Sequence, residues 1–157
     1  MDQKIIDQIE AVVGKDGYSV EPAVLYTYGF DASIFHSTPE MVVQPRSTEQ
    51  VSEIMKIAHA NRTPVVPRGA GTGLCGSAVP VKGGIVMAMQ RMDRITRISV
   101  ADLWVDVEAG VVYNDLNAEL SKYGFFFPPS PGSAEACQIG GMVATNASGT
   151  VSYTHLR

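Results

Sequence analysis

Apolar residues repeat along the chain at two spacings, and each spacing predicts a different kind of element. From Ile5 to Val13 they recur every three or four positions, which predicts an amphipathic helix that stops at Gly14. The same spacing runs from Val51 to Ala58 and from Val112 to Leu120. The sequence Ser47-Thr48-Glu49-Gln50 before the middle segment is typical of a helix N-terminus. We therefore expect three amphipathic helices.

Short apolar or alternating runs lie between these helices and predict strands. The segment from Gly17 to Pro39 has no such period, so we expect packing loops there. Because helices and strands are interleaved while several strands are adjacent in sequence, the pattern predicts an α+β fold. The predicted strands are Met41–Val43, Pro64–Val66, Ile85–Met89, Ile95–Ile98 and Leu103–Glu108.

Composition and charge narrow the class of protein. The chain has 157 residues, enough to bury a core, and its 45% hydrophobic and 18% charged residues are ordinary for a globular protein. A net charge of −4 argues against a nucleic-acid partner. No apolar run is long enough to span a membrane and no signal peptide is recognisable, so we expect a cytoplasmic protein. Two distant cysteines and three scattered histidines predict neither a disulfide nor a metal site.

The most informative stretch is the glycine loop, Pro67 to Pro80, with sequence PRGAGTGLCGSAVP. It contains four glycines and follows a short apolar run. Glycine permits close backbone approach, and successive amides in such a loop form a concavity that binds anions. The loop therefore predicts a phosphate-containing cofactor held by main-chain N–H groups.

Two familiar phosphate-binding motifs fit this loop poorly. Residues 71–76 match G-x-G-x-x-G, and Asp93 lies about 20 residues further on, as in a dinucleotide-binding Rossmann fold. That motif needs a helix that starts inside it, but Pro80 and the pair at 83–84 leave no room for one. A Walker A loop would need a lysine after the last glycine, where Ser77 stands. The NAD-dependent Rossmann dehydrogenase stays open as an alternative.

A second cluster of small residues runs from Pro128 to Gly149, about sixty residues after the first. Gly140 and Gly141 precede a short apolar run, so we expect a helix there whose free N–H groups face a ligand. Two separate cradles of this kind fit a ligand with more than one recognition region, such as a dinucleotide.

Together, PRGAGTGLCGSAVP, GIVMAM, WVDVEAGV and FPPSPGSAEACQIGGMVATNASG resemble the FAD-binding domain of the vanillyl-alcohol oxidase and p-cresol methylhydroxylase type. The resemblance covers about residues 20 to 150 and is strongest to the glycolate oxidase subunit and D-lactate dehydrogenase branch. It implies that the glycine loop surrounds the FAD pyrophosphate and that the second cluster lies along the rest of the cofactor. The implied cofactor-binding residues are Arg68, Gly69, Ala70, Gly71, Thr72, Gly73, Leu74, Gly76, Pro129, Gly132, Ser133, Cys137, Ile139, Gly140, Gly141, Ala144, Asn146, Ser148 and Gly149.

Two residues of the loop bear on how FAD would be held. Many members of the family bind the flavin covalently through a loop histidine, and the matching position here is Thr72, so we expect non-covalent FAD. Arg68 has two interpretations: a cation near phosphate, or an anchor of the loop.

The resemblance also implies the parent enzyme and the limits of this chain. We expect an FAD-dependent oxidation of a small 2-hydroxy acid, of the glycolate or D-lactate type, to the 2-oxo acid. The substrate site would come from a cap domain that this chain lacks, so no catalytic residue is assigned and the chain alone should be inactive. An iron–sulfur electron-transfer subunit is an expected partner. A non-catalytic nucleotide-binding module is the other alternative.

The predicted organisation has three parts. Residues 1–40 are an N-terminal helix and packing segment, 41–150 are a truncated FAD-binding domain, and 151–157 are a tail. The tail, Val151 to Arg157, has the sequence that the end of a transposon-based sequencing adaptor would encode, so we expect it not to be native; a natural tail with chance similarity is the alternative.

Overall fold

The structure is a computed structural model that describes residues 1–147 and 149. Ser148 and the predicted tail lie outside the described residues. The chain forms two compact units, Met1–Met92 and Asp93–Arg157. Residues 1–40 share the first unit with residues 41–92, so no boundary between compact units falls at residue 40.

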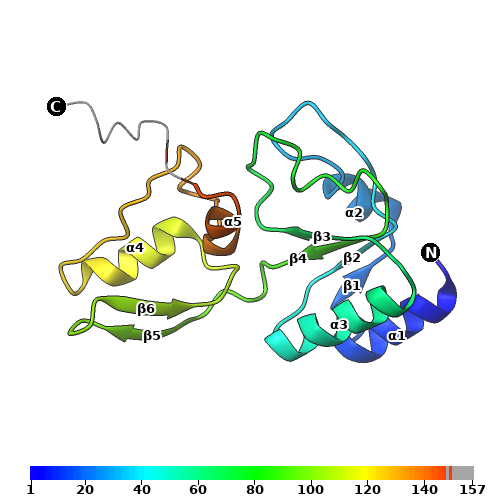
Figure 1. Ribbon diagram of the computed structural model, residues 1–157, viewed down its shortest axis with the longest axis horizontal. Coiled ribbons are helices and arrows are strands. Elements are labelled where there is room, and N and C mark those ends of the chain that lie inside the picture. The colour runs from blue at the N-terminus through cyan, green and yellow to red at the C-terminus, as the bar shows by residue number, and fades with distance from the viewer. Residues whose placement is uncertain (148, 150–157) are drawn as a thin grey trace. The chain divides into compact units, whose positions relative to one another are not determined.

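The first unit is built on a four-stranded sheet in the order β1-β2-β4-β3. Strands β2, β4 and β3 are parallel, and β1 pairs with β2 in the antiparallel direction (Figure 1). Its elements are α1 (Gln3–Val13), β1 (Tyr18–Ser19), α2 (Pro22–Thr27), β2 (Met41–Val43), α3 (Thr48–Ala60), β3 (Val65–Arg68) and β4 (Ile85–Ala88).

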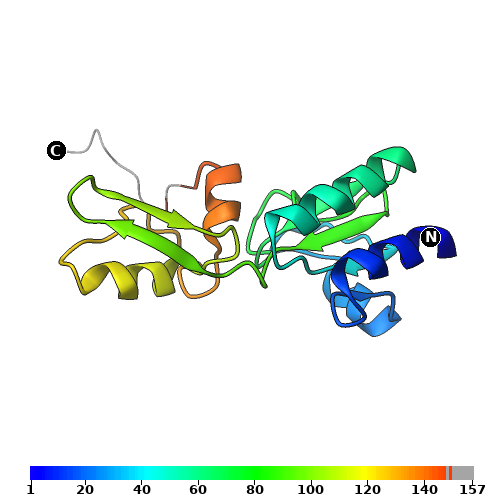
Figure 2. The same ribbon diagram turned by 90° about the horizontal axis from the view of Figure 1, so that it is seen from below.

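Helices cover both faces of this sheet (Figure 2). Successive side chains of a strand point to opposite faces, so Met41 and Val43 of β2 pack with α1 and α3, while Val42 packs with Leu25 of α2. Burial on both faces explains why β2 and β4 are continuous apolar runs rather than alternating ones.

The ends of α1 and α3 follow their sequence signals. Gly14 ends α1 and its amide donates to the carbonyl of Glu10. The Ser47 hydroxyl accepts a hydrogen bond from the amide of Gln50 at the start of α3. The Gln50 side-chain oxygen accepts a hydrogen bond from the amide of Arg46. In a capping box the donor would be the amide of the next residue, Ser47.

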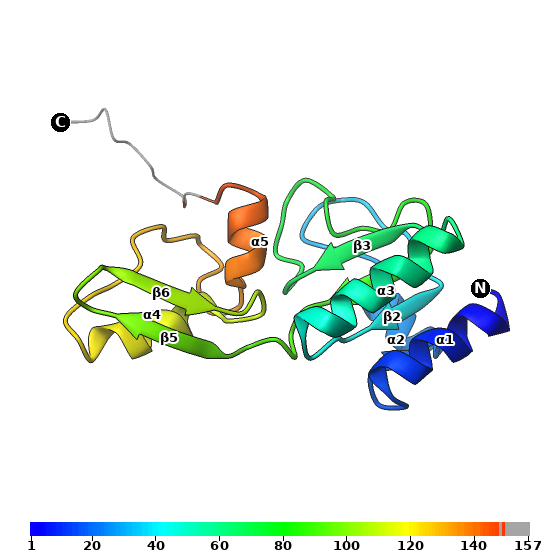
Figure 3. The ribbon, with the colours of Figure 1, turned by 60° about the horizontal axis from the view of Figure 1, so that its bottom comes forward.

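The second unit is an antiparallel hairpin with two helices (Figure 3). Apolar residues of the hairpin pack against Leu116 and Leu120 of α4, which explains the alternation along the second strand. Tyr113, whose helical spacing predicts core packing, is buried in this core, whereas Trp104 is on the exposed side beneath the Arg97 guanidinium. The elements are β5 (Ile95–Ser99), β6 (Trp104–Val107), α4 (Tyr113–Ser121) and α5 (Ile139–Ala144).

The predicted α+β class is confirmed, and three details were wrong. The segment from Gly17 to Pro39 is not only loops, because it contains β1 and α2. Met55 has the helical spacing that predicts packing on the inner face of α3, but it is 46% exposed. Cys75, a small residue that we expect to be buried, is exposed. In the described residues no helix is long and apolar enough to cross a membrane.

Candidate functional site

The glycine loop leaves the carboxyl end of β3 and returns to the start of β4, its parallel neighbour. Ligands of parallel sheets bind beyond the carboxyl ends of the strands. Residues 69–84 are all described and contain no helix, so the helix that a Rossmann fingerprint needs inside this motif is missing.

The loop carries a row of amides without protein acceptors. Within residues 1–147 and 149, the amides of eight loop residues donate no hydrogen bond, whereas those of Ala78 and Val79 just after them are occupied. Such amides are free to donate to an anion. The eight are Gly69, Ala70, Gly71, Gly73, Leu74, Cys75, Gly76 and Ser77.

A segment missed by the sequence analysis, residues 29–37, holds this loop in place. The amide of Ala32 donates to the carbonyl of Gly73 at 3.0 Å, and the Ser37 hydroxyl donates to the carbonyl of Pro80 at 2.9 Å. The ring of Phe35 lies where a side chain at Gly76 would project, 2.8 Å from an added Cβ. The loop is therefore fixed from one side by carbonyl and ring contacts, while the eight amides named above have no acceptor among the described residues.

Asp31 is the polar centre of that segment. Its carboxylate is buried and accepts hydrogen bonds from the amides of Ser33, at 2.9 Å, and Ala78, at 3.4 Å. Burial acts to raise the pKa of Asp31, but these hydrogen bonds and the charge of Arg68 outweigh it and lower the pKa. Asp31 is therefore a charged acceptor, and the Asp-Ala-Ser sequence is the one local signal that could have revealed it.

Arg68 is the last residue of β3, and its side chain is buried beneath the loop, with 7% of the residue exposed. One guanidinium nitrogen, Nη1, donates to the carbonyl of Phe30 at 2.7 Å, and the group lies over the Tyr28 ring at 5.4 Å from its centre. Burial lowers the pKa of Arg68, and the neighbouring Tyr28 and Asp31 act against this shift.

The second predicted cluster lies in the second unit. Its centre is a short antiparallel bridge between residues 112 and 138. The amide of Tyr113 donates to the carbonyl of Cys137, and the amide of Ile139 donates to the carbonyl of Val111, both at 2.9 Å. Cys137 is buried, and burial raises the pKa of its thiol, so it is a small neutral group here.

The prediction of free amides at the start of α5 was wrong for its first two residues. The amide of Ile139 donates to Val111, and that of Gly140 donates to Ala109 at 2.9 Å. A Cβ at Gly140 would lie 2.7 Å from the Cβ of Ala109, so this glycine permits close packing within the protein. Gly141 differs, because nothing lies within 4 Å of an added Cβ.

The remaining predicted residues surround this bridge. Ala144 ends α5, Asn146 follows with a left-handed backbone, and Gly149 pairs with Ser130. Pro129, Gly132 and Ser133 lie in the chain that leads to the bridge, and Ser148 is outside the described residues. Gln138 was not predicted; it is buried, and its side-chain oxygen has no partner among the described residues.

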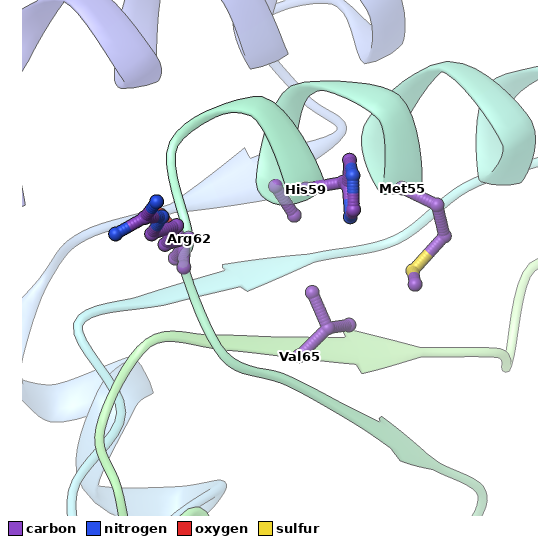
Figure 4. Close-up of a pocket in the computed structure, with 6 residues that line it drawn as sticks. Met55, His59, Arg62 and Val65 are labelled. Carbon is purple, nitrogen blue, oxygen red and sulfur yellow. The ribbon is translucent and has the colours of Figure 1, made fainter.

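A surface hollow in the first unit lies away from the glycine loop (Figure 4). It is lined by Met55, His59 and Arg62 near the end of α3 and by Val65 of β3. None of the predicted cofactor residues lines it. In the second unit, Ile139 and Gly140 line a hollow bordered by β6 and α4.

A parallel sheet with an amide-lined glycine loop defines a cofactor-binding domain for a phosphate-containing ligand. The sequence pattern of the family described as "FAD binding domain" matches residues 39–156, which is most of the chain. The chain belongs to this FAD-binding family.

Relatives and solved structures agree with this assignment. The chain is 35% identical to glycolate oxidase subunit GlcD of Bacillus subtilis (strain 168), over 91% of this chain and 31% of that protein. It is 39% identical to a probable mitochondrial D-lactate dehydrogenase of Danio rerio, over 94% of this chain and 30% of that protein. It therefore spans about a third of the length of these relatives.

The fold matches two known enzymes at low sequence identity. Alkyldihydroxyacetonephosphate synthase matches with a TM-score of 0.88 and 22% identity, over 95% of this chain and 33% of that one. p-Cresol methylhydroxylase matches with a TM-score of 0.71 and 24% identity, over 82% of this chain and 27% of that one. The predicted p-cresol methylhydroxylase type of fold is thereby confirmed.

Proposed function

We propose that this chain binds FAD non-covalently and is the cofactor-binding part of an oxidoreductase that converts a small 2-hydroxy acid into the 2-oxo acid. The observation that carries the proposal is the row of unpaired amides in the glycine loop. FAD has a pyrophosphate group, and main-chain amides recognise phosphate oxygens without requiring a counter-charge.

The family resemblance suggests a part of the cofactor for the residues of each cluster, taken separately. The loop amides of Gly69, Ala70, Gly71, Gly73, Leu74 and Gly76 are the proposed donors to the pyrophosphate. The small residues of the second cluster, including Cys137 and Gly141, would lie along the flavin and ribityl portions. When bound, the flavin supplies the redox chemistry by accepting two electrons from the substrate, while the protein supplies position and electrostatics.

The positions of the histidines support the proposal of non-covalent attachment. The loop itself has Thr72 where covalent relatives carry a histidine. His36 packs against the rings of Tyr26 and Phe30, and His59 lines the hollow of Figure 4. His155 is outside the described residues.

The substrate class rests on the names of the relatives, a glycolate oxidase subunit and D-lactate dehydrogenases. An iron–sulfur partner subunit and a cytoplasmic location stay predictions from the family resemblance. The base and the carboxylate-binding groups would come from residues outside this chain.

The test uses the product of the complete gene. The purified protein should show a flavin spectrum. Under anaerobic conditions D-lactate or glycolate should bleach the visible absorbance of the oxidised flavin in proportion to the 2-oxo acid formed. L-Lactate is the matched control for stereochemistry. A colourless protein that binds NAD would overturn the proposal, and a flavin that no 2-hydroxy acid reduces would overturn its substrate class.

A further inference from the structure

Arg68 is the one cation within the described part of the glycine loop whose role the proposed function leaves open. A guanidinium at a phosphate site would ordinarily be expected to contact the ligand. Here the side chain is buried, and its Nη1 is committed to the Phe30 carbonyl.

The guanidinium lies directly under Gly71. An added Cβ at Gly71 would lie 2.5 Å from the guanidinium carbon of Arg68 and in collision with Nη2. Gly71 also has a φ of +74°, a conformation that favours glycine. The arginine therefore occupies the space next to the turn that directs the amides of Gly71 and its neighbours.

We propose that Arg68 is a positioning residue for FAD: it supports the turn at Gly71 from inside the protein and does not contact the pyrophosphate. The inference rests on the proposed function, because the loop is taken to hold that group. Tyr28 completes the support, since its ring lies under the guanidinium and its hydroxyl accepts hydrogen bonds from the side-chain amides of Gln44 and Gln90.

This role requires the shape of arginine as well as its charge. The planar fork reaches the Phe30 carbonyl with one nitrogen while the other lies under Gly71. A lysine ammonium is a single point charge and cannot occupy both places. Lysine should therefore fail to replace Arg68, whereas a phosphate contact made through charge alone would tolerate it.

The experiment measures dissociation constants of FAD and riboflavin for the apo form of the complete gene product. Riboflavin is the control ligand because it lacks the pyrophosphate. We expect Arg68→Lys to weaken FAD binding about 10-fold or more, the usual effect of losing a charge-assisted hydrogen bond, and riboflavin binding less than about twofold. An Arg68→Lys protein that binds FAD within about twofold of the parent would overturn the inference.

A double-mutant cycle provides the second readout. Gly71→Ala should weaken FAD binding strongly in the parent and clearly less in an Arg68→Ala background, because the collision with the guanidinium is then gone. Additive effects of the two changes would overturn the inference. Thermal melting of each apo form checks that the variants are folded. If Arg68→Ala does not fold, Arg68→Lys takes its place as the background for Gly71→Ala in the cycle.

The two proposals fail in different ways. A parent protein that binds neither ligand, or binds both equally, would overturn the proposed function and this inference with it. A parent that prefers FAD, combined with a functional Arg68→Lys, would overturn only the positioning role.

Discussion

Gly140 and Gly141 are adjacent in α5 but have opposite surroundings, so replacing each with alanine should change stability in opposite directions. A methyl group at Gly140 would lie 2.7 Å from the Cβ and 2.9 Å from the carbonyl oxygen of Ala109, which is backbone and cannot rotate away. A methyl group at Gly141 would meet nothing within 4 Å.

The magnitudes follow from two terms. Overpacking of this kind costs about 1–3 kcal/mol, and alanine in a helix gains up to about 1 kcal/mol over glycine. Gly140→Ala should therefore lose about 1–2 kcal/mol of unfolding free energy, while Gly141→Ala should gain about 0.5–1 kcal/mol. The two variants should differ by about 2 kcal/mol.

Urea unfolding followed by tryptophan fluorescence measures this difference in the second unit. The chain has one tryptophan, Trp104, and it lies on β6 of that unit. With a slope of about 1–2 kcal/mol per M, the midpoints of the two variants should be about 1–2 M apart. Equal midpoints, or a Gly141→Ala variant less stable than Gly140→Ala, would refute the packing of α5 against Ala109.

Three further predictions test other parts of the account. Hydrogen bonds from the Arg94 guanidinium lower the pKa of Glu108. The stability that the Glu108 carboxylate contributes should therefore be complete above about pH 5 and be lost as the pH falls below the ordinary 4.5. In urea unfolding, the unfolding free energy of Glu108→Gln should decline less from about pH 5 to about pH 3 than that of the parent. Gly84→Ala should destabilise the first unit by about 2 kcal/mol or more, because its φ is +75° and the added Cβ would collide with the Pro64 carbonyl; an unchanged melting temperature by circular dichroism would contradict this. Acid precipitation of the complete gene product should leave all flavin in the supernatant, whereas flavin in the pellet would show a covalent bond despite Thr72.

Elements that bury a periodic apolar face could be predicted from sequence alone. The faces of α1, α3 and α4 and the apolar run of β2 all corresponded to structure. The segment with β1 and α2 could not be predicted, because β1 has two half-buried residues and exists through pairing with β2, while α2 buries only Leu25. Such short elements are determined by contacts that are distant in sequence.

The candidate site shows the same division between local and distant information. The glycine loop was recognisable because its conformation depends on its own residues. Its support by residues 29–37 depends on contacts made 38 to 47 positions apart, and the only local sign of them in the sequence is the Asp-Ala-Ser pattern at Asp31. The inward direction of the Arg68 side chain, which distinguishes an anchor of the loop from a phosphate contact, also depends on contacts distant in sequence. So does the hydrogen bond from the Gly140 amide to the Ala109 carbonyl.

The central claim is that unpaired amides of the glycine loop hold the pyrophosphate of FAD. The most direct measurement is hydrogen–deuterium exchange of the complete gene product, followed in peptides that cover residues 69–77, without ligand, with FAD and with riboflavin. We expect the eight unpaired amides of this segment to exchange rapidly in the apo protein and with riboflavin, and to be clearly protected with FAD. Tight FAD binding with no change of exchange in this loop would contradict it.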